Sequence, residues 1–371
     1  MNIYDSSGNI IDMASEFACA PLDNYGDIST ASGFVSAFDS AMADEKISGI
    51  SIPYGVYNVN APLNITRSNF VIDGNECLLN MRTDAGAEVN TDCFKINDKS
   101  RIVIKNFLIN MRQNANSPSG TAFYFLDASQ VTVENIDVFS IGCRGALIYN
   151  TDATSTTPGA KKIFFKNVKL RGIDVQNTTE PQWPCGIIAV NLIDSGFEDC
   201  VVSGMCRFSL EFKNYSKNCY MKNNVIYGGT LTSEHESGLA LGGDRPDSEN
   251  ILGDGLVFIG NVVRNCKFPL YLGRVANSVF SDNVFEGQIF AVGLYSCVVN
   301  GNIIKSTTKY NIPLIRVSGC EDLLMSENLY DPGNNDLFIV PSSNTNVLVK
   351  GYMNGHEINV PNPTSGTPTL A

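Results

Sequence analysis

The sequence predicts an all-β protein, a single right-handed parallel β-helix of about eleven coils, on two observations. The first is a recurring phrase in which alternating apolar residues meet an asparagine, as in VIDGNECLL around Asn75 and VFIGNVV around Asn261. The second is composition, because charged residues are only 17% of the chain while glycine contributes 32 residues. That balance is typical of proteins with many short strands and tight turns, and a phrase that returns along the whole chain indicates a repeat architecture.

Each repeat predicts two strands that meet at a corner. Alternation with a period of two predicts strands with one buried face. Asparagine tolerates the left-handed backbone conformation and its amide can bond to neighbours, so we expect it to turn the corner and to stack from coil to coil. The phrases centre on Asn75, Asn106, Asn135, Asn167, Asn224, Asn261, Asn283, Asn302, Asn328 and Asn354, with Cys200 standing where another asparagine would fall.

The repeat also sets the domain boundaries. We expect an N-terminal segment with a capping helix at residues 1–48, the β-helix at 49–356 and a loose Pro/Thr-rich tail at 357–371. Open ends of a sheet invite aggregation, so a helix over the first coil would protect it. Ser29 or Thr30 can cap such a helix, and its apolar face would contain Phe34, Phe38, Ala41 and Met42.

Charge and cysteine usage exclude several classes of function. The net charge is −12 with no basic block, so nucleic acid is not an expected partner. No apolar run is long enough to span a bilayer, and the N-terminus lacks the basic start and apolar run of a signal peptide. The eleven cysteines are odd in number and contain no CxxC pair, which argues against zinc. We expect them to be buried, reduced thiols of a protein made in a cytoplasm.

One passage carries a family resemblance. A strand ending with Pro53, Gly55 and Tyr57, followed by the Asp73–Gly74–Asn75 turn, resembles the opening of the pectate-lyase-like β-helix superfamily. As architecture, the resemblance covers residues 20–360. It implies the fold, whereas the chemistry stays open because the superfamily holds hydrolases, lyases, epimerases and non-catalytic adhesins.

Absent motifs narrow this resemblance. Polygalacturonase-type enzymes carry NTD, DD, GHG and RIK motifs; NTD occurs at 90–92 and 150–152, but the other three do not occur. The WIDH segment of calcium pectate lyases is also missing. With free thiols and no signal peptide, the chain is most similar to a bacteriophage tailspike or depolymerase. That similarity implies assembly in the host cytoplasm, a place in the virion tail, a homotrimer, and a capsule or O-antigen glycan as partner.

The second strand of each coil predicts a site for a sugar chain. Small residues flanked by tyrosine, glutamate and arginine would form a shallow floor with polar walls; the alternative is that the small residues pack against a neighbouring subunit. Predicted to point inward are Phe208, Leu210, Phe212, Leu239, Leu241, Leu270, Leu272, Val292 and Leu294. Predicted to point outward are Glu211, Lys213, Ala240, Gly242, Tyr271, Gly273, Ala291, Gly293, Tyr295 and Arg316.

Carboxylates near this floor are candidates for glycoside hydrolysis, which uses two of them. Glu211 and Asp244 would lie on the order of 8 Å apart, one coil step plus one or two residues, which is in the inverting range. Either could be the acid, with the more buried one favoured. Glu236 is a third candidate, but it could lie up to about 26 Å from Asp244 along an extended strand.

Long connections at residues 112–120, 171–186 and 227–238 should form one lip of this groove, and the connection at 242–255 the opposite lip. The expected substrate-binding residues are Trp183, Lys213, His235, Arg245, Asp247, Tyr271, Arg274 and Tyr295. No cofactor is expected. A β-eliminating lyase would instead use Lys213, Tyr271 or His235 as base, with Arg245 or Arg274 neutralising a uronate, and could involve calcium.

The hypothesis that these observations favour is a glycoside-hydrolysing depolymerase of tailspike type that acts on a bacterial surface glycan. The alternatives are a non-catalytic, glycan-binding or structural spike and a polysaccharide lyase.

Overall fold

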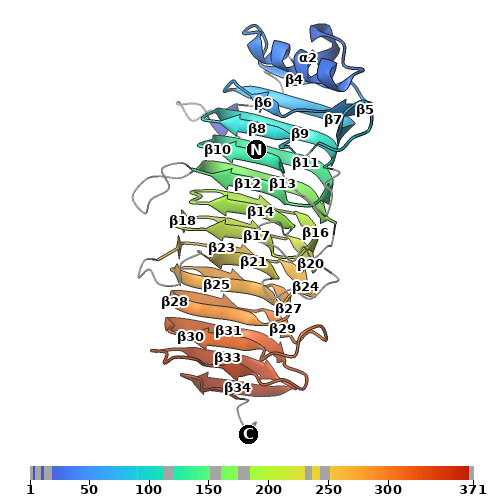
Figure 1. Ribbon diagram of the computed structural model, residues 1–371. Coiled ribbons are helices and arrows are strands. Elements are labelled where there is room, and N and C mark those ends of the chain that lie inside the picture. The colour runs from blue at the N-terminus through green and yellow to red at the C-terminus, as the bar shows by residue number, and fades with distance from the viewer. Residues whose placement is uncertain are drawn as a thin grey trace.

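The structure, a computed structural model, describes residues 19–89, 91–111, 120–150, 160–173, 184–229, 236–242 and 251–366. It also describes the backbone of two short antiparallel strands, β1 (Ile3–Tyr4) and β2 (Ile10–Ile11). The predicted right-handed parallel β-helix is confirmed: successive coils stack into one rod whose strands pair in parallel (Figure 1).

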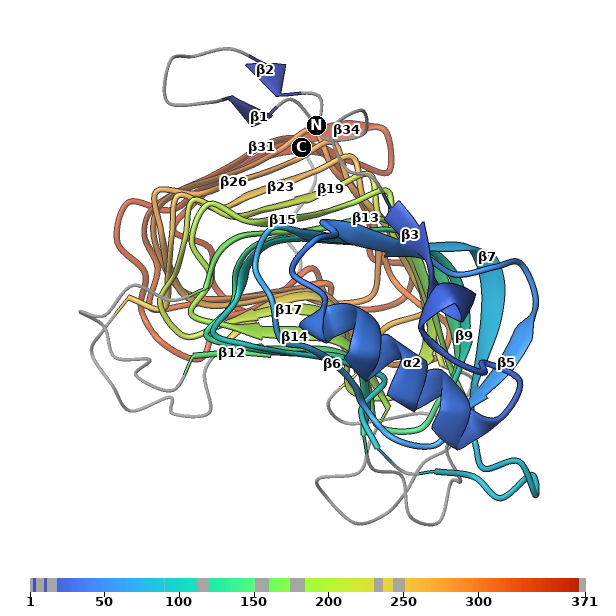
Figure 2. The ribbon, with the colours of Figure 1, turned by 90° about the horizontal axis from the view of Figure 1, so that it is seen from above.

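Three parallel sheets form the sides of the rod (Figure 2). We name them by their order within a coil. Sheet A contains β3 (Cys19–Pro21), β4 (Gly49–Ser51), the first halves of β7 (Phe70–Met81), β9 (Ser100–Asn110), β11 (Ser129–Ile141) and β13 (Lys161–Gly172), then β15 (Gly196–Glu198), β19 (Tyr220–Lys222), β23 (Val257–Ile259), β26 (Val279–Ser281), the end of β28 (Ile289–Asn300), β31 (Glu321–Asp331) and β33 (Leu348–Met353).

Sheet B follows sheet A around a corner. It contains β5 (Val56–Val59), the second halves of β7, β9, β11, β13, β31 and β33, and β16 (Val201–Met205), β20 (Val225–Gly228), β24 (Val262–Arg264), β27 (Val284–Glu286) and β29 (Ile303–Lys305). Two short strands, β18 (Ser216–Lys217) and β22 (Gly253–Asp254), lie between sheets C and A.

Sheet C completes each coil. Its eleven strands among the described residues match the predicted number of about eleven coils. They are β6 (Leu63–Ile65), β8 (Phe94–Asn97), β10 (Thr121–Leu126), β12 (Arg144–Tyr149), β14 (Cys185–Val190), β17 (Phe208–Lys213), β21 (Ser237–Gly242), β25 (Phe268–Ala276), the start of β28, β30 (Ile315–Ser318) and β32 (Phe338–Ile339).

The core is a column of stacked apolar side chains inside the three sheets. Because strands repeat at about 4.8 Å, equivalent inward residues of adjacent coils touch. Phenylalanines of sheets A and C also meet across the interior: their ring centroids follow one another at 4.9–6.0 Å along Phe94, Phe123, Phe165, Phe197, Phe212, Phe258 and Phe280.

Helix α2 (Ala31–Ala43) lies at the N-terminal end of the rod, preceded by a short 3-10 helix, η1 (Leu22–Tyr25) (Figures 1 and 2). Thr30 is its N-cap and accepts a hydrogen bond from the Gly33 N–H at 3.1 Å. Its buried face contains Phe34, Phe38, Ala41 and Met42, as the sequence pattern predicts, and this face packs into the same core as the first coils.

The predicted asparagine stack exists, but it has two forms. Asn106, Asn135 and Asn167 have φ of 50–60° and bond to one another on the outside of the corner between sheets A and B. From Cys200 onward the residue before the asparagine takes the left-handed conformation instead, at Asn223, Gly260, Asp282, Gly301 and Glu327. The asparagines then point inward and form a buried ladder with amide contacts of 2.9 Å through Asn224, Asn261, Asn283, Asn302 and Asn328.

Cys200 begins this inner ladder. Its N–H donates to the Asn224 Oδ1 at 2.9 Å, so the cysteine stands at the asparagine phase as expected. Asn354 does not occupy the equivalent position in its coil. Asn354 and Gly355 both have positive φ and form the turn of a hairpin, for which an Asn-Gly pair is the preferred sequence.

The C-terminal tail differs from its prediction. Strand β34 (His356–Pro361) pairs antiparallel with β33, and Gly366 bridges to Phe338. The turn at Asn354 reverses the chain, so residues expected to be loose cover the last parallel strand instead.

Ten of the eleven cysteines are buried and all are free, as predicted, with Cys19 partly exposed. Burial raises the pKa of the Cys200 thiol and of the Cys219 thiol to about 12, so both stay protonated. No helix in the described part of the chain is long and apolar enough to cross a membrane.

Candidate functional site

The outer face of sheet C carries one continuous column of side chains. The register places Glu211 beside Ala240, Ala240 beside Tyr271, Tyr271 beside Phe290, and Phe290 beside Arg316. The outward prediction therefore holds for Glu211, Tyr271 and Arg316. The inward prediction holds for Leu210, Phe212, Leu239, Leu241, Leu270, Leu272 and Leu294, all fully buried.

Two predicted directions are wrong in β28. Ala291 pairs with Leu272 and belongs to the core, whereas Val292 pairs with Gly273 and is partly exposed. Gly293, with φ of 63°, resets the alternation at a corner, so that Leu294 points inward again. The predicted directions assume a regular alternation through this corner, which Gly293 interrupts. The outward residue that was missed is Phe290.

Phe208 also departs from its predicted position. It is only half-buried, and the guanidinium carbon of Arg207 lies 5.2 Å from its ring centroid. Phe208 precedes the core residue Leu210 by two positions, so a regular alternation would place it inside. It is the first residue of the strand, and at this position the core does not fully enclose the side chain.

Phe268, Tyr271 and Phe290 form an aromatic platform on this face. The rings of Tyr271 and Phe290 are stacked, with centroids 4.3 Å apart and planes 10° from parallel, and Phe268 packs edge-on against both at 5.8 and 5.6 Å. The Arg316 guanidinium lies 4.9 Å from the Phe290 centroid. Its Nε is buried and has no hydrogen-bond partner among the described residues. The platform thus combines flat rings with a guanidinium.

Glu211 lies on the same column, two strands from Tyr271. It is 2% exposed, and Ala240 between them is fully buried. The predicted open floor is therefore a covered surface at these two positions. Burial raises the pKa of the Tyr271 hydroxyl; the Arg316 charge opposes this rise and the Glu211 charge adds to it. The Glu211 and Arg316 charges thus both act on Tyr271.

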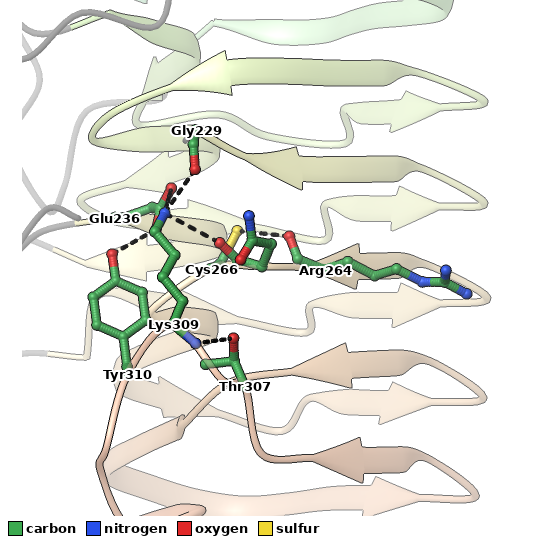
Figure 3. Close-up of polar contacts among 8 residues, drawn as sticks. Gly229, Glu236, Arg264, Cys266, Thr307, Lys309 and Tyr310 are labelled. Carbon is green, nitrogen blue, oxygen red and sulfur yellow. Dashed lines mark hydrogen bonds and ion pairs between the residues drawn. The ribbon is translucent and has the colours of Figure 1, made fainter. Parts of the chain in front are cut away.

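Glu236 does not lie on this column. Its carboxylate is 1% exposed and receives Lys309 Nζ at 3.0 and 2.8 Å and the Tyr310 hydroxyl at 2.8 Å (Figure 3). Lys309 also donates to the Gly229 carbonyl at 2.7 Å. Burial raises the pKa of Glu236, although Lys309 and Tyr310 lower it in part. This geometry makes Glu236 an anchor for the segment 306–314.

The anchored segment reaches the edge of the platform. Lys267 Nζ lies 5.4 Å from the Phe268 ring centroid and 6.0 Å from the Tyr310 centroid. The 306–314 segment, which connects β29 and β30, therefore lies next to the aromatic platform and borders it on one side.

The remaining predicted residues lie in three places. Lys213 is half-buried and two residues beyond Glu211 on β17. Arg274 (φ 56°) and Tyr295, which pairs with Ala276, lie at the corner between sheets C and A, off the column. Outside the described residues fall Trp183, His235, Asp244, Arg245 and Asp247.

Sequence reasoning missed a further carboxylate on this side of the rod. Asp92 precedes β8, and burial is the main cause that raises its pKa, while Lys95, Thr121 and Arg144 lower it. Lys95 lies 5.3 Å from the Tyr124 ring centroid. The NTD motif at 90–92, one of the four polygalacturonase-type motifs, is the sequence signal that contains Asp92.

A separate cavity of about 270 Å³ lies at the corner between sheets A and B. Its lining includes the outer asparagines Asn106, Asn135 and Asn167 together with Asp137 and Lys169. None of the predicted site residues borders it.

No family model and no curated protein sequence matches this chain. Solved structures do match. An exopolygalacturonase from Thermotoga maritima aligns with a TM-score of 0.57 at 12% identity, over 96% of this chain and 98% of that one. The Streptococcus pneumoniae surface protein and adhesin PfbA aligns at 0.54 and 11%, over 91% and 99%.

A third match is ORF18 of Geobacillus virus E2, with a TM-score of 0.52 and 10% identity over 94% of this chain and 64% of that one. At these identities the likeness establishes the fold alone. Together with the parallel coils, the three sheets and the asparagine ladder, it identifies this chain as a right-handed parallel β-helix protein.

Proposed function

We propose that this protein degrades a bacterial surface polysaccharide by glycoside hydrolysis on the outer face of sheet C. The observation that carries the proposal is the column that joins Glu211 to the stacked rings of Tyr271 and Phe290 and to Arg316. Aromatic faces stack against the apolar faces of sugar rings, and a guanidinium donates to paired oxygens. The similarity to an exopolygalacturonase supports a glycan as substrate.

Glu211 is proposed as one of the two catalytic carboxyl groups, with Asp244 as its partner. Glu211 lies almost fully buried on this column, and the general acid of such a pair must hold the proton that it donates to the leaving oxygen. Glu236 is not proposed as catalytic, because Lys309 and Tyr310 already occupy its oxygens. No cofactor takes part in this proposal.

Among the candidate lyase bases, Tyr271 is the less suitable one, because a base must be deprotonated near neutral pH and burial raises the pKa of Tyr271 above its ordinary value. The second candidate is a glycan-binding spike that does not cut, which the similarity to an adhesin favours. It would use the same platform.

The test is release of reducing ends from a panel of purified capsules and O-antigens. We expect cleavage of one glycan by the wild type, and a loss of about 10²–10⁴-fold in Glu211→Gln and Asp244→Asn with binding retained. Glu198→Gln, on the outer side of sheet A, is the matched control and should keep full activity. Binding without cleavage by the wild type supports the spike, and an ultraviolet-absorbing unsaturated product supports a lyase.

For location and assembly, we propose a virion tail protein that forms a homotrimer after synthesis in the host cytoplasm. The similarity to a phage-encoded protein supports this. Immunogold labelling of virions tests the location.

A further inference from the structure

The outer face of sheet A changes character halfway along the rod. In the first coils its corner-side column alternates in sign, through Asp73, Lys105, Glu134, Lys166, Glu198 and Lys222, with ion pairs such as Lys222–Glu198 at 3.1 Å. In the next coils the same column continues as Ile259, Ser281, Asn300 and Ser326. The charged ladder ends at Lys222.

An apolar column runs beside those uncharged residues. The register aligns Val257, Val279, Val298, Leu324 and Leu348. Val257 and Val279 are each 40% exposed and Leu324 is 36% exposed. Four successive strands, β23, β26, β28 and β31, therefore present eight outward side chains, and none of these eight is charged. We call this surface face A.

Sheet B presents a second apolar column in the same coils. Its members are all partly or well exposed, with Leu329 at 49% and Tyr352 at 51%. The register aligns Val225, Val262, Val284, Ile303, Leu329 and Tyr352. We call this surface face B. A charged column of Arg264, Glu286, Lys305 and Asp331 borders it on the side away from the corner.

The two faces meet at the asparagine corner, so each coil of this half of the rod carries both (Figure 2). One flat partner cannot cover two sides of a corner. A ring of identical subunits can, because face A of each subunit then packs on face B of the next. Such heterologous contacts close into a ring when the rotation between subunits closes.

We propose that these faces bind neighbouring copies of this chain, with face A of one subunit against face B of the next and the rods parallel. The occupant follows from the spacing. The exposed side chains repeat at the strand separation of about 4.8 Å, and a partner rod with the same repeat can interdigitate with every one of them. A second copy of this chain has the same strand repeat.

The two faces match in length. The apolar column of face A runs over five strands from Val257 to Leu348, about 20 Å, and that of face B over six strands from Val225 to Tyr352, about 24 Å. Each subunit of a ring makes two such contacts. This inference deepens the homotrimer proposed above and is independent of the proposed cleavage.

Sedimentation velocity of the full chain tests the inference. We expect the wild type to sediment as a closed oligomer, and Val279→Lys on face A and Ile303→Lys on face B each to sediment as a monomer. Both side chains point outward, so the circular dichroism spectrum and thermal midpoint of the monomers should show a folded β-helix. The control is Val103→Lys, on the same sheet among the charged coils, which should leave the oligomer intact.

Mixing the two monomeric variants decides the geometry. The face A variant retains face B and the face B variant retains face A, so a mixture should form a 1:1 dimer and no larger species. A two-fold contact of face A with face A would instead leave the face B variant dimeric alone, and this would overturn the ring.

A wild type that stays monomeric at all concentrations would also overturn the proposal, as would a Val279→Lys variant with the wild-type oligomer. The reducing-end assay on a monomeric variant remains a separate test of the proposed cleavage, so the two failures are distinguishable.

Discussion

Lys309 shows how one residue can hold distant parts of the chain together. Its side chain is 9% exposed, and its ammonium group bonds to Glu236, which lies 73 positions earlier in the sequence. Removal of one partner from a buried ion pair is far more costly than removal of an exposed charge, because the remaining charge stays buried. The same ammonium group also donates to the Gly229 and Asn265 carbonyls, so it joins the 306–314 segment to earlier coils.

Lys309→Met should therefore lower the free energy of unfolding by about 3 kcal/mol or more at neutral pH. The folded-state pKa of Glu236 is already raised by burial, and without Lys309 it should rise further. The folded state then binds the Glu236 proton more tightly than the unfolded chain does. The free energy of unfolding therefore falls as the pH rises from the unfolded-state pKa of Glu236 to its higher folded-state pKa. The penalty should shrink on acidification, when Glu236 is neutral.

Urea unfolding at about pH 7 and about pH 4.5 measures this change in penalty. Lys305→Met, which removes an exposed lysine of sheet B, is the control and should have little effect at either pH. An equal penalty at both pH values for Lys309→Met would contradict the role assigned to the pair.

The same residues show the limits of sequence reading. Glu236 was a candidate because carboxylates are dense around it, but density in the sequence does not reveal a lysine 73 positions away. Glu211 was found because strand alternation determines its direction. Phe290 was missed because a corner at Gly293 shifts the alternation by one residue.

At the scale of elements, helix α2 follows its sequence signals closely. The apolar spacing of its residues specifies the buried face, and two neighbouring hydroxyl residues can supply the cap. In the structure the N-cap is Thr30, whose Oγ1 accepts a hydrogen bond from the Gly33 N–H. The Ser29 N–H instead bonds to Asp27.

Thr30→Ala should destabilise the helix by about 1 kcal/mol, because one N–H at its start loses its acceptor. Ser29→Ala is the matched control and should change the stability by much less. Hydrogen exchange of the α2 amides, measured by mass spectrometry, reports the local opening. Equal effects of the two changes would contradict the assignment of Thr30 as the cap.

At the scale of the whole molecule, the inner asparagine ladder links successive coils from Cys200 to Asn328. Each amide donates to the next asparagine, and the same acceptor oxygen also receives a backbone N–H, as between Asn261 and Asn283. These groups are almost fully buried, so water cannot replace a lost partner. The outer ladder is exposed and lacks this constraint.

Asn283→Ala should lower the free energy of unfolding by about 3 kcal/mol, since two buried donors on Asn261 and the Phe258 carbonyl lose their partner. Asn135→Ala should cost about 1–2 kcal/mol, chiefly because alanine disfavours its left-handed backbone. Urea unfolding of both variants gives the comparison, and a larger loss for Asn135→Ala would contradict the distinction between the ladders.

The sequence by itself determined the β-helix, its number of coils, the helix α2 with its buried face and the burial of the cysteines. These features depend on local periodicity, which each segment carries independently. The Asn-Gly pair at 354–355 also predicts a hairpin from the local sequence alone, whereas the repeat phrase predicts a corner of a further coil at Asn354.

Only the tertiary structure decided which side chains meet across coils. The stacked Tyr271 and Phe290, the Glu236–Lys309 pair and the uncharged faces on sheets A and B all join residues whose separation in the chain varies with the length of the connections. Register between coils is fixed by the stacking of the whole core, so no local pattern specifies it. The sequence therefore predicts where a side chain lies along its own strand, whereas the fold determines which side chains of other coils it contacts.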